Sequence, residues 1–157
     1  MTPVRAIVQD TYGDADVLRL VAHDPRARKV KLEQTLAPGL PGVRAKEDHL
    51  TQVLLNLSLN AIDAMGAKGT LTIETRAEGG VVSALVSDTG PGIPTAVAAR
   101  LFEPFFTTKP AGQGTGLGLF VSRNILEGLG GKLELARTSS EGTVFEVRLP
   151  QDVKAGV

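Results

Sequence analysis

The segment KEDHLTQVLLNLSLNAIDAM, residues 46–65, carries the clearest helical periodicity in the chain. Its apolar side chains recur every three or four residues, which predicts an amphipathic helix that ends at Gly66. Asn56 and Asn60 are four residues apart, so they share one face of this helix, about 6 Å apart along its axis. The apolar positions are Leu50, Val53, Leu54, Leu57, Ala61 and Ala64.

An asparagine side chain offers a neutral oxygen that suits a hard cation. Mg²⁺ takes few ligands from a protein and relies on phosphate oxygens for the rest, so Asn56 and Asn60 are candidates for a magnesium site. The alternative is structural, with both amides capping or bridging buried backbone groups. This segment alone leaves both interpretations open.

Strands and helices alternate on both sides of this helix. Thr2-Pro3 is typical of a helix start, with an N-cap followed by a proline in the first turn, and Asp24-Pro25 is typical of a helix end. Together they predict a helix over residues 3–24. Strand pairs separated by helices indicate an α+β fold, a two-layer sandwich whose mixed sheet is covered by helices on one face. The predicted strands are 29–36, 70–76, 81–88 and two within 132–150, and the remaining helices begin at 94 and span 117–130.

Length and composition point to one ordinary domain. A chain of 157 residues can bury a core of its own, and the absence of Cys excludes disulfides, thiolate metal sites and a thiol nucleophile. Seventeen basic residues balance seventeen acidic ones, so no general attraction to nucleic acid or to an acidic membrane is expected. Polar residues interrupt every apolar stretch, which predicts a soluble chain without a signal peptide or membrane span.

Asp88 ends the predicted strand 81–88 and begins the sequence DTGPGI, residues 88–93. A carboxylate at a buried strand end needs a partner. Because it only accepts hydrogen bonds, it suits the exocyclic amine of adenine and repels the carbonyl oxygen of guanine. Gly90 and Gly92 would leave room for a flat ring against the backbone. An ordinary Asp-Thr-Gly turn is the alternative.

Aromatic rings and glycines meet in LFEPFFTTKPAGQGTGLGLF, residues 101–120. Three of the five Phe residues precede four glycines, at every second position from 112 to 118. The stretch contains no GxxxxGK[ST] phosphate loop. It does run directly into a predicted helix, so backbone N–H groups at the helix start would be able to face phosphate oxygens. A flexible glycine-rich linker is the alternative.

Taken together and in this order, these segments resemble the catalytic, ATP-binding domain of sensor histidine kinases. That domain belongs to the GHKL, or Bergerat, superfamily, which also contains gyrase, a major heat-shock chaperone and the mismatch-repair ATPases. QVLLNLSLNAIDAM is similar to the N box, DTGPGIP and GTGLGL to the two glycine boxes, and LFEPFFTTK to the F box. The resemblance covers about residues 30–150, is closest to the nitrogen-regulation branch, and implies a Bergerat fold with ATP and Mg²⁺ as cofactors.

The resemblance also implies a role for each matching residue. Asn60 would coordinate Mg²⁺, Asp88 would bind adenine, and Thr143 would support adenine, often through water. Residues 102–115 would form a mobile lid that Phe side chains anchor, and residues 115–119 would meet the phosphates. The implied ATP-binding residues are Asn56, Asn60, Asp63, Asp88, Gly90, Gly92, Ile93, Phe102, Lys109, Gly114, Thr115, Gly116, Leu117, Gly118, Leu119 and Thr143.

Asn56 favours a kinase over an ATPase. ATP-hydrolysing relatives carry a Glu one helical turn before the magnesium Asn, and a carboxamide there cannot accept a proton from water at neutral pH. The resemblance therefore implies a protein-histidine kinase, in which transfer depends on positioning and charge neutralisation, with Asn56 and Lys109 as catalytic residues. Asp63 departs from the family, because many members carry Lys there; it would join a water network near the metal or lie at the surface.

Neither histidine fits the family's phosphoacceptor. His23 is followed by Asp24-Pro25, which breaks a helix, and His49 lacks a partner motif, so both are expected to be structural. The implied partners are a His-containing dimerisation domain, on the same parent chain or separate, and through it a response regulator. Residues 1–28 would be a helical connection to that domain, 29–150 the ATP-binding domain and 151–157 a tail.

The remaining expectations concern the state of the domain. By itself it would be monomeric, cytoplasmic and inactive without its acceptor domain, whether or not the parent protein is anchored in a membrane. A free-standing kinase or ATPase of the same superfamily, acting on a partner protein, is the alternative function.

Overall fold

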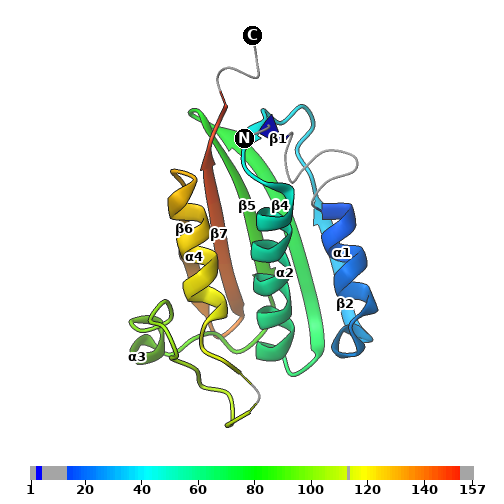
Figure 1. The fold of residues 1–157 in the computed structure, drawn as a ribbon. Helices are drawn as coiled ribbons and strands as arrows, with labels where there is room; N and C mark the ends of the chain where they lie inside the picture. The colour runs from blue at the N-terminus through cyan, green and yellow to red at the C-terminus, as the bar shows by residue number, and fades with distance from the viewer. Residues whose placement is uncertain (1–2, 5–13, 113, 153–157) are drawn as a thin grey trace.

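A five-stranded mixed sheet forms one layer of the protein (Figure 1). The computed structural model describes residues 3–4, 14–112 and 114–152. The sheet order is β2-β4-β5-β7-β6, with β2 and β4 parallel and the other neighbours antiparallel, which confirms the predicted mixed sheet. The strands are β2 (Lys29–Thr35), β4 (Lys68–Glu78), β5 (Val81–Asp88), β6 (Lys132–Ser139) and β7 (Gly142–Pro150).

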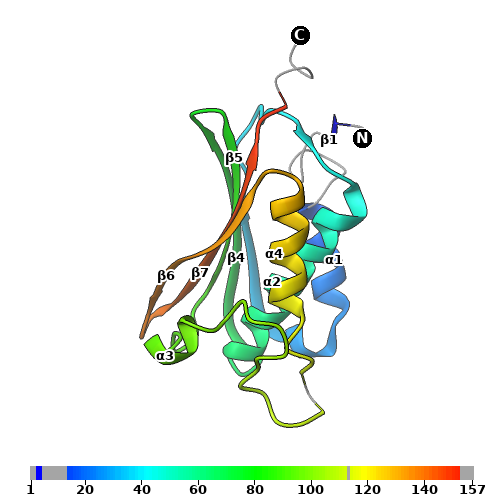
Figure 2. The same ribbon diagram turned by 60° about the vertical axis from the view of Figure 1, so that its left-hand side comes forward.

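Three helices cover one face of this sheet, and the view in Figure 2 shows the two layers side by side. They are α1 (Asp14–His23), α2 (Glu47–Ala64) and α4 (Gly118–Gly128). α2 lies between the other two and packs against both of them and against the central strands. The opposite face of the sheet carries charged side chains, among them an ion pair between Arg76 and Glu146 at 3.4 Å. The predicted α+β two-layer sandwich is confirmed.

The core between the two layers explains why α2 is a helix. Leu50, Leu54 and Leu57 are at most 1% exposed and pack with Leu71 and Ile73 of β4, which are fully buried. Burying one such side chain contributes roughly 1.5–3 kcal/mol relative to exposure. The helical period leaves Asn56 and Asn60 half-buried on another side of α2.

The N-terminal region differs in part from the prediction. The expected helix over 3–24 is confirmed for α1, but Pro3–Val4 form a short strand, β1, that pairs with β3 (Val43–Arg44). The helix prediction is wrong there because β3 offers backbone partners, and Pro is tolerated in an edge strand. Residues 5–13 lie outside the described part. Val17 and Val21 of α1 are fully buried in the same core as α2. The division into a connecting segment over residues 1–28 and a domain that begins at residue 29 stays a prediction.

The connections carry only short helices. A single 3-10 turn, η1 (Pro25–Ala27), joins α1 to β2. The helix predicted to begin at residue 94 is α3 (Thr95–Ala98), which is four residues long. Residues 101–112 and 114–117, between α3 and α4, form turns and irregular structure. Within the described ranges, no helix has both the length and the hydrophobicity needed to cross a lipid bilayer.

Candidate functional site

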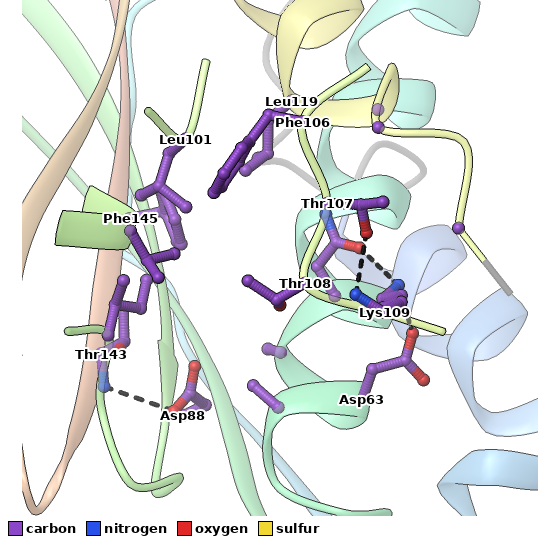
Figure 3. Close-up of a pocket in the computed structure, with 18 of the residues that line it drawn as sticks. Asp63, Asp88, Leu101, Phe106, Thr107, Thr108, Lys109, Leu119, Thr143 and Phe145 are labelled. Atoms are coloured by element: carbon purple, nitrogen blue, oxygen red, sulfur yellow. Dashed lines mark hydrogen bonds and ion pairs between the residues drawn. The ribbon is translucent and has the colours of Figure 1, made fainter. Parts of the chain in front are cut away.

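A cavity of about 560 Å³ lies between α2, the adjoining ends of β5 and β7, and the segments 101–109 and 114–119 (Figure 3). This volume falls within the range of about 300–1,000 Å³ that is usual for small-molecule sites. The structure brings all the residues predicted to bind ATP to its wall except Gly90, Phe102 and Leu117. Residues from positions 56 to 143 therefore converge on one cavity.

Asp88 lies at one end of the cavity, because β5 ends there. The side chain is buried, and its Oδ1 accepts hydrogen bonds from the backbone N–H groups of Gly90 at 2.8 Å and Thr143 at 3.3 Å. Burial raises the pKa of the Asp88 carboxyl, and the two N–H donors oppose this rise because they favour the ionised form. Both donors meet Oδ1, so Oδ2 is left for a ligand that donates a hydrogen bond.

The strands and the loop around Asp88 are tied together by threonine side chains. Thr143 lies opposite Asp88 in the register of β5 and β7, and its hydroxyl lies 2.9 Å from that of Thr138. The Thr138 hydroxyl also accepts the backbone N–H of Ile93 at 2.8 Å. Gly92 has a φ of +87°, and the Ser139 carbonyl fills the space where its Cβ would be. On the Cβ side of Gly92 the expected room for a flat ring is therefore filled by protein, although Gly92 itself lines the cavity.

Apolar side chains line the cavity between Asp88 and the start of α4: Phe145 and Leu101 on the side of Asp88, and Phe106 and Leu119 beyond them (Figure 3). Only Leu119 was predicted. A signal for Phe145 was present, because it lies two residues after Thr143 on the same strand and so faces the same side of the sheet. Leu101 and Phe106 are brought to the cavity by a loop whose path no spacing predicts. An apolar wall next to a hydrogen-bond acceptor suits a heteroaromatic ring that carries an amine.

The opposite end of the cavity is polar. The Lys109 ammonium lies 2.7 Å from Oδ2 of Asp63 and 3.4 Å from Oδ1 of Asn60. The described residues contain no group of three or more His, Cys, Asp or Glu side chains that could hold a metal ion by themselves. The oxygen of Asn60 already faces a cation, so the donor fits Mg²⁺ provided that a ligand supplies most of the other oxygens.

Asn56 is held in place by α4. Its Nδ2 donates to the Ser122 hydroxyl at 3.3 Å, and its Oδ1 lies where a Cβ on Gly118 would be. Gly118 therefore permits the close approach of α4 to α2. Ser122 is 2% exposed and was not predicted, although it lies four residues after Gly118 and hence on the same face of α4.

A backbone hydrogen bond from Phe105 N–H to the Gly116 carbonyl, at 2.8 Å, brings together two parts of the chain that precede α4. The backbone of Phe105 also fills the space where a Cβ on Gly116 would be. Phe105 as a whole residue is 74% exposed. Phe102 does not reach the cavity wall, because its ring packs against the core below the Arg123 guanidinium, 5.2 Å from the ring centroid. Phe106 lines the cavity instead.

Comparison of the sequence with known proteins agrees with this geometry. The profile of the family described as histidine kinase-, DNA gyrase B-, and HSP90-like ATPase matches residues 45–153. The chain is 41% identical over 136 residues to the sensor histidine kinase ZraS of Escherichia coli K12, a match that covers 87% of this chain and 29% of that protein. It is 45% identical over 155 residues to the two-component sensor PprA of Pseudomonas aeruginosa, covering 94% and 17%. The chain thus spans less than a third of these relatives.

Comparison with solved structures gives the same result. The catalytic domain of the histidine kinase ThkA superposes with a TM-score of 0.76 at 34% identity, covering 87% of this chain and 89% of that one. Full-length ShkA in complex with AMPPNP gives 0.74 at 30% identity, covering 93% and 32%. ThkA in complex with the response regulator protein TrrA gives 0.72 at 29% identity, covering 88% and 39%.

Proposed function

The chain belongs to the family of histidine kinase-, DNA gyrase B- and HSP90-like ATPases and is a catalytic, ATP-binding domain of the sensor histidine kinase type, and we propose that it transfers the γ-phosphoryl group of ATP to a histidine of a dimerisation domain. The acceptor domain lies on the same parent chain or on a separate one. The likeness to the nitrogen-regulation branch stays a prediction.

One observation carries this proposal: the cavity has an adenine-type end and a phosphate-type end. Asp88 and the apolar wall of Leu101, Phe106 and Phe145 suit the amine and the ring of adenine. Asn60 and Lys109 at the other end suit a metal-bound, negatively charged phosphate chain. We infer that ATP binds with its base against Asp88 and its phosphates between Asn60 and the start of α4.

The residues at the phosphate end favour transfer to a histidine over transfer to water. Asp63 and Asp88 are the only carboxylates that line the described cavity, and Asp88 lies at the other end. Both carboxylate oxygens of Asp63 are already engaged by two cations, Arg26 and Lys109. Asn56 cannot take a proton at neutral pH. Catalysis then rests on positioning and charge neutralisation.

Each residue at this end has a proposed part in that positioning. Asn60 would hold Mg²⁺, which supplies charge neutralisation on the phosphates when bound. Asn56, fixed by Ser122, would orient groups beside the metal, and Lys109 would neutralise the γ-phosphate. The N–H groups near Gly116 and Gly118, at the start of α4, would receive the phosphate oxygens.

The acceptor histidine is proposed to be external. His23 ends α1 and His49 lies in the first turn of α2; both are exposed, and neither lines the cavity. The structure of ThkA with a response regulator supports a response regulator as the next partner in the phosphorelay. We propose a monomer for this domain, since dimer contacts would lie in the acceptor domain.

Calorimetry of the chain with ATP and Mg²⁺, with GTP as control, tests nucleotide binding. We expect saturable heat for ATP, none for GTP and no lasting heat flow. Sustained heat in proportion to the enzyme would indicate hydrolysis and would contradict the kinase assignment.

A chimera tests the transfer itself. This chain would replace the corresponding segment of Escherichia coli ZraS, with the same chimera carrying Asn60→Ala as the matched control. We expect ATP-dependent, acid-labile phosphorylation that the control lacks. A chimera that binds ATP but never becomes phosphorylated would contradict the proposal.

A further inference from the structure

Arg26 connects the loop between α1 and β2 to the polar end of the cavity. It belongs to η1 and lies 37 positions from its partner Asp63, outside the segment 45–153 that matches the family profile. None of the sequence motifs includes it. Its contact with the cavity wall is therefore visible only in the folded structure.

The Arg26 guanidinium is held in a fixed orientation by Asp24. Nε and Nη2 of Arg26 donate to the two carboxylate oxygens of Asp24, each at 2.9 Å, and the Arg26 backbone N–H also donates to Oδ1 at 2.9 Å. These bonds lower the pKa of Asp24 to about 2 and raise that of Arg26. A two-pronged contact of this kind orients the planar guanidinium as well as binding it.

The remaining arm of Arg26 reaches Asp63. Nη1 donates to both carboxylate oxygens of Asp63, at 3.0 and 3.1 Å, while Lys109 takes Oδ2 from the cavity side at 2.7 Å. One carboxylate on the cavity wall therefore has two cations. One is fixed outside the cavity, and the other belongs to the loop that lines it.

The charges explain why two cations are needed. Asp63 is the only carboxylate at the phosphate end of the described cavity, and it would repel an incoming phosphate chain. If Lys109 turned from Asp63 to a phosphate, Asp63 would be left without that partner. Arg26 would still neutralise Asp63, which lowers the free-energy cost of moving the Lys109 ammonium from Asp63 to the phosphate.

We propose that Arg26 is a positioning residue of the nucleotide site: it neutralises Asp63 from outside the cavity, so that Lys109 is free to bind phosphate. This inference rests on the proposed nucleotide-binding function. It predicts an effect of Arg26 that grows with the negative charge of the ligand, because ADP and ATP keep a net negative charge even when Mg²⁺ is bound, whereas adenosine has none.

Binding of adenosine, ADP and ATP to the Arg26→Met variant, at one fixed Mg²⁺ concentration, tests the proposal. Competition against a fluorescent ATP analogue gives each affinity. We expect ATP to weaken about two- to five-fold, ADP less and adenosine not at all, as for the loss of one partly exposed ion pair. Arg26→Lys should restore most of the ATP affinity, since it keeps the charge.

Two further variants separate this role from a structural one. Arg28→Met removes the same charge two residues away, from a side chain with no ion pair among the described residues, and should change none of the three affinities. In an Asp63→Asn background, Arg26→Met should lose its effect, because no charge is left to neutralise.

Three other results would overturn the inference, and a fourth would overturn the proposed function with it. An equal weakening of adenosine, ADP and ATP would make Arg26 a structural residue and overturn the inference. An Arg26→Met effect that persists with Asp63→Asn would also overturn it. If the wild-type chain bound no nucleotide, both the proposed function and this inference would fall, whereas wild-type binding with no charge-dependent effect would remove the inference alone.

Discussion

Replacement of Asp88 by Asn reverses the polarity of one atom in the cavity. Oδ1 of Asp88 accepts two backbone N–H groups, and the other carboxylate oxygen points into the cavity (Figure 3). In the variant, the amide oxygen should take the place of Oδ1 and leave the NH₂ group facing the ligand. The opposite rotamer would set that NH₂ against two N–H donors, which costs about 1–3 kcal/mol for an unsatisfied group.

The size of the effect on ATP follows from the lost acceptor. A hydrogen bond to a charged group is worth about 1.5–3 kcal/mol, which corresponds to about 10- to 150-fold in affinity. Inosine triphosphate differs from ATP in carrying a carbonyl where adenine carries its amine. The new NH₂ group would be able to donate to that carbonyl, so the ratio of ATP to inosine triphosphate affinity should fall more than the ATP affinity itself.

The stability of the Asp88→Asn variant should not fall together with its affinity for ATP. Burial raises the pKa of Asp88, so the ionised carboxylate destabilises the folded state at neutral pH, and this cost disappears as the pH falls through that raised pKa. The variant should therefore melt at the same temperature as the wild type or higher at neutral pH. Any advantage should vanish in acid, where the wild-type carboxyl is protonated.

Calorimetry with both nucleotides and thermal melts at neutral and mildly acidic pH would measure these effects. A folded variant with unchanged ATP affinity would remove Asp88 from adenine recognition. An equal loss of ATP and inosine triphosphate would show that the substitution damages the site in general rather than its choice of base. A lower melting temperature at neutral pH would refute the argument from burial.

Three other substitutions test the site and the core. Gly118→Ala should weaken Mg²⁺-dependent ATP binding, because its Cβ would displace the Asn56 amide; Gly128→Ala on the same helix, where nothing lies within 4 Å of the added Cβ, is the control in the same calorimetric titration. Asn60→Ala should remove the Mg²⁺ dependence of ATP binding, and a dependence that persists in titrations with and without Mg²⁺ would place the metal elsewhere. Leu126→Ala should lower the free energy of unfolding in urea by about 2–5 kcal/mol, since Leu126 is fully buried, and a loss under about 1 kcal/mol would contradict that packing.

Local periodicity predicted much of this site because it fixes direction along one element. The helical period places Asn56 and Asn60 on one face of α2, and a strand that ends at Asp88 delivers its side chain to the edge of the sheet. The order of strand pairs and helices along the chain predicted the mixed sheet with one covered face. These features depend on neighbours in the chain, so the chain alone reveals them.

The paths of the loops and the contacts between elements could not be predicted from local periodicity. The N-terminal strand Pro3–Val4 exists because β3 pairs with it, and the sequence pattern there predicts a helix. The sequence does not distinguish Phe102 from Phe106, yet only Phe106 lines the cavity. The path of the loop between α3 and α4, where the Phe105 N–H binds the Gly116 carbonyl, decides this. That the glycines from residue 112 to 118 let this loop move stays a prediction, and the structure adds that Gly118 permits the close approach of α4 to Asn56.

The sequence by itself determined the class of fold, the order of its motifs and the two amides and the carboxylate that identify the cavity. Only the tertiary structure decided which charges meet there. Arg26, Asp63 and Lys109 come from three separate segments, and their ion pairs depend on distances across the fold that no spacing along the chain encodes. Periodicity gives the direction of a side chain on its own element, but the identity of its partner depends on how the elements pack together.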